Sequence, residues 1–92
     1  MRKVTFRCNA PYANRVAVAG SFNNWDSRRN PMHRRTNGDW GAELSLPPGR
    51  YEYCFVVDSQ WMRDPTAAEA VPNPYGGRNS VRVVSANANN SR

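Results

Sequence analysis

Alternation of apolar and polar residues at period two is the feature that most restricts what this chain can fold into. In the segment RYEYCFVVD, the residues Tyr51, Tyr53, Phe55 and Val57 occupy every second position. Successive side chains of a β-strand point to opposite faces, so this pattern predicts a strand with one face against a core. Helix signals are nearly absent, and the chain is therefore predicted to be built from strands.

Several other segments alternate in the same way and are separated by Pro, Gly and Asn. The further predicted strands are KVTFRC, with Val4, Phe6 and Cys8 inward; RVAVAGSF; a weak edge strand, MHRRT; DWGAELSL, with Trp40, Ala42, Leu44 and Leu46 inward; QWM; and NSVRVV, with Val81 and Val83 inward and Arg82 outward. Seven or so short strands at this spacing predict an all-β fold, an antiparallel β-sandwich.

The length of 92 residues allows one domain with one modest core. We expect the sandwich to occupy residues 1–84. The remaining segment 85–92, SANANNSR, has nothing to bury and is expected to be a disordered tail. One long connection, residues 64–79, holds three of the seven prolines and has room for one helical turn at TAAEA. Loops of that length in compact domains are usually functional or mobile.

The sequence does not favour a membrane protein or a nucleic-acid-binding protein. No apolar segment approaches the ~20 residues of a membrane span, and the N-terminus lacks the apolar centre of a signal peptide, so we expect a soluble, cytoplasmic protein. The net charge is +6, and residues 1–38 carry eight basic residues against one acidic residue. Single arginines among strand and turn residues often only keep a surface hydrated, so nucleic acid is not the expected partner.

Catalysis, metal binding and a cofactor find little support in the sequence. The single histidine, His33, lies in the weak edge strand and has no nucleophile motif to serve. Asp58 and Asp64 are interpreted as a turn residue and a residue before proline, not as a glycosidase pair. Cys8 and Cys54 lack the spacing and the histidines of a zinc site, and their predicted faces oppose each other, so a disulfide is not expected. We expect a non-catalytic domain without metal or cofactor.

Three aromatic residues fall in predicted turns or loops. Trp25, Trp61 and Tyr75 each lie beside Asn, Gln, Asp or Gly. A single loop tryptophan can serve as a lid over one end of a core. Three aromatic residues with amide neighbours are instead typical of sugar binding, because the CH face of a sugar stacks on a ring while its hydroxyls need donors and acceptors.

The segments VAVAGSFNNWD, LPPGRYEYCFVVDSQWMRDP and NSVRVV closely resemble the family 48 carbohydrate-binding module, which includes the glycogen-binding domain of the AMP-activated protein kinase β subunit and the early-set domain of isoamylases and branching enzymes. The resemblance covers residues 3–84. It implies an immunoglobulin-like early-set sandwich that binds α-1,4-linked glucan. It also implies that Trp25 and Trp61 are the stacking platforms and that Asn79 hydrogen-bonds glucose hydroxyls.

Two positions depart from the family pattern. Cys54 replaces a lysine, which removes a charged donor, and Tyr75 replaces a leucine. We hypothesise that Arg63 or Arg78 supplies the missing donor, that Tyr75 enlarges the stacking surface, and that affinity is weak. The main alternative is an interaction module that has lost sugar affinity and serves as the partner of a glucan-metabolising enzyme. A third reading is binding of a phosphorylated glucan or another anion through the Arg-rich N-terminal half.

Overall fold

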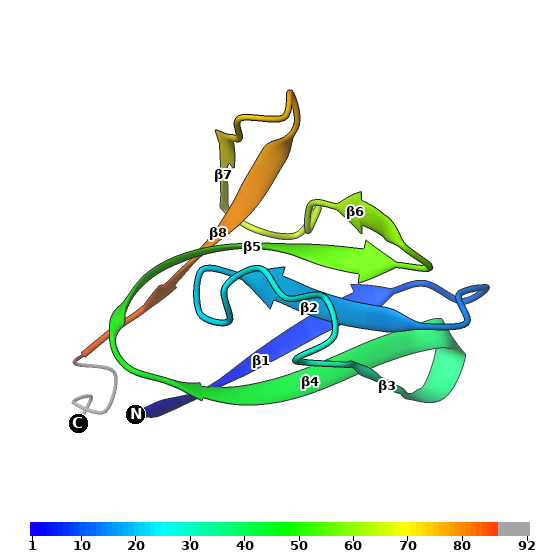
Figure 1. Cartoon of the computed structure of the whole chain (residues 1–92). Coiled ribbons are helices and arrows are strands. Elements are labelled where there is room, and N and C mark those ends of the chain that lie inside the picture. Colours follow the sequence, from blue (N-terminus) through cyan, green and yellow to red (C-terminus); the bar gives the residue numbers. More distant parts are fainter. Residues whose placement is uncertain (87–92) are drawn as a thin grey trace.

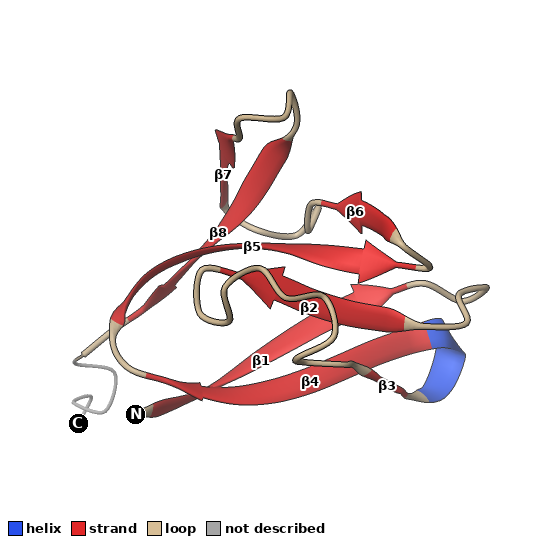
Figure 2. Ribbon diagram, in the orientation of Figure 1, coloured by secondary structure: helices blue, strands red, loops and turns tan. Residues whose placement is uncertain are grey.

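Eight antiparallel strands form the whole of the fold in the computed structural model, which describes residues 1–86 (Figure 1). The strands are β1 (Arg2–Asn9), β2 (Val16–Gly20), β3 (His33–Arg34), β4 (Asp39–Leu46), β5 (Gly49–Val57), β6 (Gln60–Met62), β7 (Glu69–Pro72) and β8 (Arg78–Val84). A single 3-10 turn, Thr36–Gly38, precedes β4, and no α-helix occurs in the described residues (Figure 2). The expected all-β class and antiparallel sandwich are confirmed.

The strands divide into two sheets. The small sheet has the order β1-β4-β3, and the large sheet has the order β2-β5-β8-β7. Strand β5 changes its partner along one edge, because Gly49 to Tyr53 pair with β8 whereas Phe55 to Val57 pair with β6. The other edge pairs with β2. The outer face of the large sheet therefore brings β5, β6 and β8 together around Cys54.

The core lies between the two sheets and confirms most of the predicted inward faces. Its buried members include Val4, Phe6, Trp40, Ala42, Leu46, Tyr53 and Phe55, with Cys8, Leu44, Tyr51 and Val57 packed against them. Phe6 and Tyr53 meet edge to face at 4.9 Å between ring centroids. Both cysteines are free, and Cys54 lies on the face of β5 opposite Tyr53 and Phe55.

Val81 of β8 is buried as predicted, at 6% exposed, but the predicted orientations of Arg82 and Val83 are wrong. Val83 is 65% exposed, whereas Val84 joins the core and the Arg82 guanidinium lies 5.1 Å from the centroid of the Phe6 ring. Arg82 also donates a 2.8 Å hydrogen bond to the carbonyl of Thr5, which links the sheets. The long stem of an arginine covers apolar surface while its polar end reaches an acceptor, so an inward arginine is stable here.

The connection after β6 contains a strand, β7, and not the helical turn for which its sequence has room. Asp64 Oδ1 accepts hydrogen bonds from the backbone N–H and the hydroxyl of Thr66, which closes a side-chain turn. The chain then continues as β7, which pairs with β8 from Glu69 to Pro72. Pairing satisfies the backbone groups that β8 would otherwise leave open at its edge.

Residues 85 and 86 follow β8 without regular structure, and the rest of the expected disordered tail, residues 87–92, lies outside the described residues. Within residues 1–86, no helix has the length and apolar character needed to span a membrane. Over the same range, no group of three His, Cys, Asp or Glu side chains is arranged to hold a metal ion.

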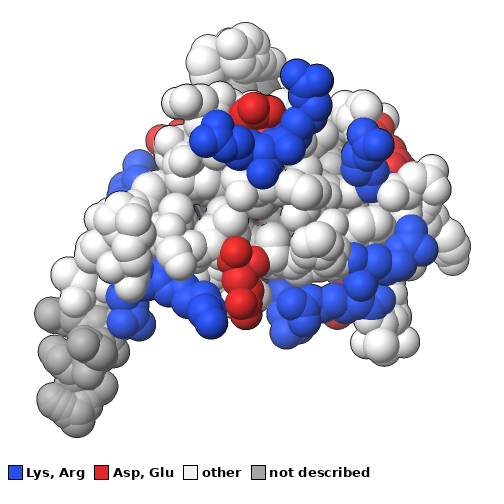
Figure 3. Space-filling view, turned by 60° about the horizontal axis from the view of Figure 1, so that its bottom comes forward, with Lys and Arg blue, Asp and Glu red and all other residues white. Residues whose placement is uncertain are grey.

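The basic side chains do not form one continuous stripe on the face shown in Figure 3, where Lys and Arg gather in separate groups with acidic residues between them. Three ion pairs join exposed side chains of the described residues, and two of them share Arg50, which contacts Glu52 and Glu69.

Candidate functional site

The loop after β2 displays Trp25, and buried residues next to Trp25 in the sequence fix the conformation of this loop. The buried side chain of Asn23 accepts a 3.0 Å hydrogen bond from the Gly20 N–H and donates to the Val18 carbonyl at 3.1 Å and to Asn30 Oδ1 at 2.7 Å. A Cβ at Gly20 would lie 2.5 Å from the Glu52 carbonyl oxygen, so glycine is required. The loop is therefore fixed before any ligand arrives.

Phe22 and Trp25 have different roles within this loop. Phe22 turns toward the core and packs against Phe6 and Tyr51, with ring centroids 5.6 and 6.1 Å away. Trp25 adopts a left-handed backbone conformation with φ of 58° and keeps its indole half-buried on the outer side of the large sheet. The aromatic residue that anchors the loop is thus Phe22, and Trp25 is free to contact a ligand.

A two-residue hairpin presents Trp61. Asp58 and Ser59 connect β5 to β6 with positive φ at both positions, 49° and 75°, which matches the twist of a tight antiparallel hairpin. The Asp58 carboxylate accepts 2.9 Å hydrogen bonds from the backbone N–H groups of Asn14 and Arg15. Trp61 pairs with Val56 across the hairpin and is 51% exposed.

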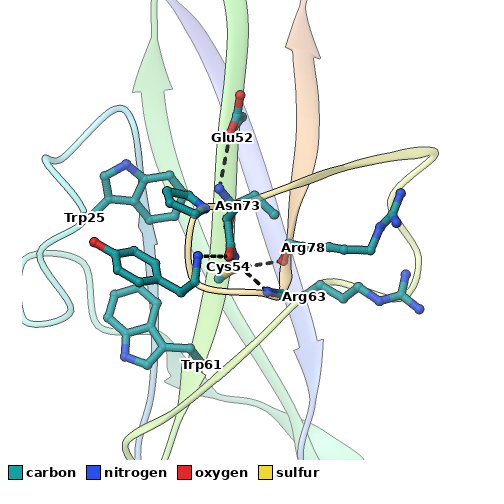
Figure 4. A pocket seen from close by; sticks show the side chains of 11 residues that line it. Trp25, Glu52, Cys54, Trp61, Arg63, Asn73 and Arg78 are labelled. Carbon is teal, nitrogen blue, oxygen red and sulfur yellow. Dashed lines mark hydrogen bonds between the residues drawn. The ribbon is translucent and has the colours of Figure 1, made fainter.

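Trp25 and Trp61 lie side by side, with ring centroids 6.5 Å apart and planes tilted by 38°. Trp25 comes from the loop after β2, whereas Trp61 lies in strand β6 and not in a loop as predicted; Figure 4 shows both rings on one side of Cys54. Because of this tilt, the two rings do not form one flat surface. A tilted pair of rings fits a ligand whose successive rings turn relative to each other.

A network of amides borders the two rings. Asn79 is 8% exposed, donates to Glu52 Oε1 at 3.2 Å and accepts from Asn73 Nδ2 at 3.1 Å. Asn73 Oδ1 in turn accepts from the backbone N–H groups of Tyr75 and Gly77, at 2.9 and 3.1 Å. Asn73 therefore fixes the loop between β7 and β8, and Asn79 keeps one amide hydrogen for a ligand.

The thiol of Cys54 lies beneath this network, 3.4 Å from Asn79 Oδ1. Burial raises the pKa of Cys54, against a smaller opposing effect of a backbone hydrogen bond at Ser80, so the thiol stays neutral at physiological pH. A neutral thiol is a weak donor and carries no charge. The floor of the site thus offers a ligand little polar attraction.

All six residues selected from the sequence line one open depression of about 1080 Å³. Its described lining consists of Trp25, Glu52, Cys54, Trp61, Arg63, Asn73, Pro74, Tyr75, Gly77, Arg78 and Asn79. Tyr75 stands at its rim and is 92% exposed. Sequence reasoning missed Glu52 and Asn73. Glu52 alternates with Cys54 on the outer face of β5 and was accessible to that argument, whereas nothing in the sequence separates Asn73 from an ordinary loop asparagine.

The two arginines point away from the tryptophan pair. Figure 4 shows the side chains of Arg63 and Arg78 extending from the far side of Cys54. Arg78 donates a 3.3 Å hydrogen bond to the carbonyl of Ala70. Neither guanidinium occupies the place above Cys54 that a lysine at this position would reach.

The residues that were weighed for catalysis have structural roles or lie at the surface. His33 is exposed on the edge strand β3. The Asp58 carboxylate is used by backbone amides, and the buried Asp64 carboxylate accepts a 2.6 Å hydrogen bond from the Tyr53 hydroxyl. The depression is lined by aromatic rings, amides and arginines, an arrangement that can stack and hydrogen-bond a polyhydroxylated ligand.

Comparison with known proteins points to the same class of ligand. The family described as the glycogen recognition site of AMP-activated protein kinase matches residues 3–90. A Xanthomonas campestris 1,4-alpha-glucan branching enzyme, GlgB 2, is 47% identical over 58 residues, which are 59% of this chain and 8% of the enzyme. The mouse 5'-AMP-activated protein kinase subunit beta-2 is 47% identical over 51 residues, 55% of this chain and 18% of the subunit.

A third relative is the Arabidopsis thaliana protein PTST homolog 2, chloroplastic, which is 36% identical over 73 residues, 79% of this chain and 13% of that protein. The chain thus spans less than a fifth of the length of each of these relatives. The match of the family description runs through both tryptophan loops, β5 and β8. From the strand order, the paired indoles and this match, the chain belongs to the family of the glycogen recognition site of AMP-activated protein kinase.

Proposed function

We propose that this chain is a non-catalytic module that binds α-1,4-linked glucan on the outer face of its large sheet. The observation that carries the proposal is the Trp25–Trp61 pair, whose centroids are 6.5 Å apart at one wall of an open depression. Consecutive glucose units of an α-1,4 chain are turned relative to each other. Two tilted indoles can therefore receive two neighbouring units, and Asn79 and Glu52 can bind their hydroxyls.

The expected affinity is low. Stacking one sugar ring removes on the order of 100 Å² of apolar area, about 2.5 kcal/mol at ~25 cal/mol/Å². Two stacks therefore give about 5 kcal/mol, while association itself costs at least roughly 4 kcal/mol. Polar contacts decide the outcome, and the weak donor at Cys54 places the dissociation constant at roughly micromolar to millimolar.

In this proposal Arg63, Arg78 and Tyr75 contact the glucan beyond the tryptophan pair. The hydrogen bond from Arg78 to Ala70 is long, at 3.3 Å, and its acceptor is a surface carbonyl, so the guanidinium can turn toward a ligand at small cost. Tyr75 is 92% exposed and can add a third stacking surface. These contacts replace only part of the attraction that a lysine at position 54 would supply.

The alternative role is attachment to a glucan-metabolising enzyme. One relative supports it by name, a 1,4-alpha-glucan branching enzyme, in which the matched part is a small fraction of a longer chain. The two roles are compatible if the module holds the glucan and its other sheet contacts the enzyme. The cytoplasmic location expected from the sequence stays a prediction.

Retention on immobilised glycogen tests the proposal. Wild type is compared with Trp25→Ala and Trp61→Ala, and the matched control is Tyr12→Ala, because Tyr12 is 95% exposed outside the depression. Both tryptophan variants should lose retention and the control should keep it, with all four proteins melting cooperatively. Retention of both folded tryptophan variants at the wild-type level would contradict glucan binding at this face.

A further inference from the structure

A second cavity adjoins the tryptophan pair and is not explained by binding of a neutral glucan. Its volume is about 170 Å³, and the described side chains that line it include Arg15, Ser27, Arg28, Ser59 and Trp61. A water molecule takes ~30 Å³, so the space suits a compact tetrahedral anion and is too small for another sugar chain. We call it the small cavity.

The polar groups of the small cavity are those that bind phosphate. Among its lining residues, Arg15 and Arg28 carry planar, charged guanidinium groups of the kind that matches phosphate oxygens, and Ser27 and Ser59 carry hydroxyls that can donate to them. No Asp or Glu is among its described lining residues. Within residues 1–86, the side chains of Arg15 and Arg28 make neither an ion pair nor a hydrogen bond, and only backbone groups of these residues are used, namely both N–H groups and the Arg15 carbonyl.

Two carboxylates, those of Asp26 and Asp58, are close in sequence to residues that line the small cavity, and both already accept hydrogen bonds from backbone N–H groups. Asp58 accepts from the backbone N–H groups of Asn14 and Arg15, and Asp26 Oδ1 accepts a 2.9 Å hydrogen bond from the Arg28 N–H. Both turns are thereby fixed, and the two arginine side chains are left without a partner of opposite charge. Elsewhere in the fold arginines do find partners, as Arg50 does with Glu69 at 3.1 Å.

The small cavity is joined to the depression by Trp61, which lines both. The same two loops serve both sites. The loop after β2 gives Trp25 to the depression and Ser27 and Arg28 to the small cavity, and the β5–β6 turn gives Ser59 beside Trp61. A glucose unit stacked on Trp61 therefore has the small cavity at its rim.

The position of Ser59 follows from the two-residue turn between β5 and β6. Its φ of 75° belongs to that turn, which places Ser59 at the small cavity, two residues before Trp61.

We propose that the small cavity binds the phosphate monoester of a phosphorylated glucan whose glucose unit stacks on Trp61. The inference rests on the proposed glucan binding and deepens it, because it distinguishes phosphorylated from neutral chains. Arg15 and Arg28 hold the phosphate, Ser27 and Ser59 donate to its oxygens, and Trp61 orients the sugar that carries it.

Calorimetric titration with three ligands tests this: maltoheptaose, maltoheptaose with one 6-phosphate, and free glucose 6-phosphate. The phosphorylated heptasaccharide should bind about tenfold more tightly than the neutral one, as one or more charge-assisted hydrogen bonds imply. The difference should shrink as ionic strength rises from about 0.05 to 0.5 M. Free glucose 6-phosphate should bind far more weakly, and equal affinity for it would overturn the assignment to a glucan ester.

The double variant Arg15→Gln/Arg28→Gln should lose the preference for the phosphorylated heptasaccharide and keep the wild-type affinity for neutral maltoheptaose. Arg7→Gln is the matched control, because Arg7 is an exposed arginine on the small sheet, and it should keep the preference. Equal affinities of wild type for the two heptasaccharides, or a preference that survives in the double variant, would overturn this inference alone. Failure of neutral maltoheptaose to bind wild type would instead contradict the proposed function.

Discussion

The hydroxyl of Tyr53 donates a 2.6 Å hydrogen bond to the carboxylate of Asp64, and both residues are buried, with 1% and 7% of their surface exposed. The backbone N–H of Asp64 also donates to Ser80 Oγ at 2.6 Å. These bonds fix the chain immediately after Trp61 and Arg63. The core aromatic residue on one face of β5 thus positions the site on the other face.

Removing this hydroxyl should destabilise the fold and change its response to alkali. Burial raises the pKa of Tyr53 well above its ordinary value near 10, with further contributions from the hydrogen bond to Asp64 and from its charge. The unfolded state therefore loses its proton first, so stability should be full below about pH 10 and fall as the pH rises above it. Chemical denaturation from pH 8 to 11 measures this.

For the same pair, Tyr53→Phe should lower the free energy of unfolding by roughly 1–3 kcal/mol at pH 8, because a buried carboxylate loses a partner. The variant should also show a smaller alkaline decline than wild type. A variant with an unchanged alkaline decline would show that this tyrosine does not control it.

Asn23→Ala should weaken glucan binding although Asn23 does not line the depression. The change removes three hydrogen bonds that hold the loop displaying Trp25. We expect a loss of roughly 1–3 kcal/mol in the free energy of unfolding, since buried backbone groups lose their partners, and a lower affinity for maltoheptaose. Asn14→Ala is the comparison, because Asn14 is exposed outside the depression. Asn23→Ala with unchanged affinity would show that the loop is ordered without this side chain.

Ser59→Gly should stabilise the fold. The left-handed conformation costs a non-glycine residue roughly 1–2 kcal/mol, and about 1 kcal/mol raises the melting temperature of a domain of this size by roughly 4–8 °C. Ser59→Ala removes the hydroxyl but keeps the strain, so it should melt near wild type. If the two variants have equal melting temperatures, relief of backbone strain at position 59 is not the cause of any stabilisation.

Cys54→Lys should strengthen glucan binding. The lysine stem would leave the floor of the open depression beneath Asn79, and its ammonium would supply a charged donor. One such hydrogen bond is worth roughly 1.5–3 kcal/mol, or about tenfold or more in affinity. Cys54→Ser controls for removal of the thiol. If calorimetry with maltoheptaose gives the lysine variant no advantage, Arg63 or Arg78 already supplies the donor.

The fold was predictable wherever a strand has one apolar and one polar face. β1, β4 and β5 were assigned the correct inward residues for this reason. β8 was not, because Ser80 and Arg82 lie inward through bonds to Asp64 and Thr5 that no alternation pattern encodes. β7 was missed because its four residues, Glu69–Pro72, are polar at one end and include a proline, and only its pairing with β8 makes it a strand.

The site was predictable as far as aromatic residues in loops are unusual. Trp25, Trp61 and Tyr75 were selected on that ground, and all three line the depression, although Trp61 lies in strand β6 and not in a loop. The orientation of Arg63 and Arg78 was not predictable, because a long flexible side chain takes its direction from nearby acceptors. Asn73 escaped notice because it acts by holding backbone N–H groups of its own loop.

The indole N–H signals of the three tryptophans give the most direct test of the central claim. Trp25 and Trp61 form the proposed platform, while Trp40 is 6% exposed and its Nε1–H donates a 3.0 Å hydrogen bond to the Ala10 carbonyl in the core. On titration of ¹⁵N-labelled protein with maltoheptaose, the Trp25 and Trp61 indole signals should shift together along one binding curve, and the Trp40 signal should stay in place. Unmoved Trp25 and Trp61 signals at saturating maltoheptaose would contradict glucan binding by this pair.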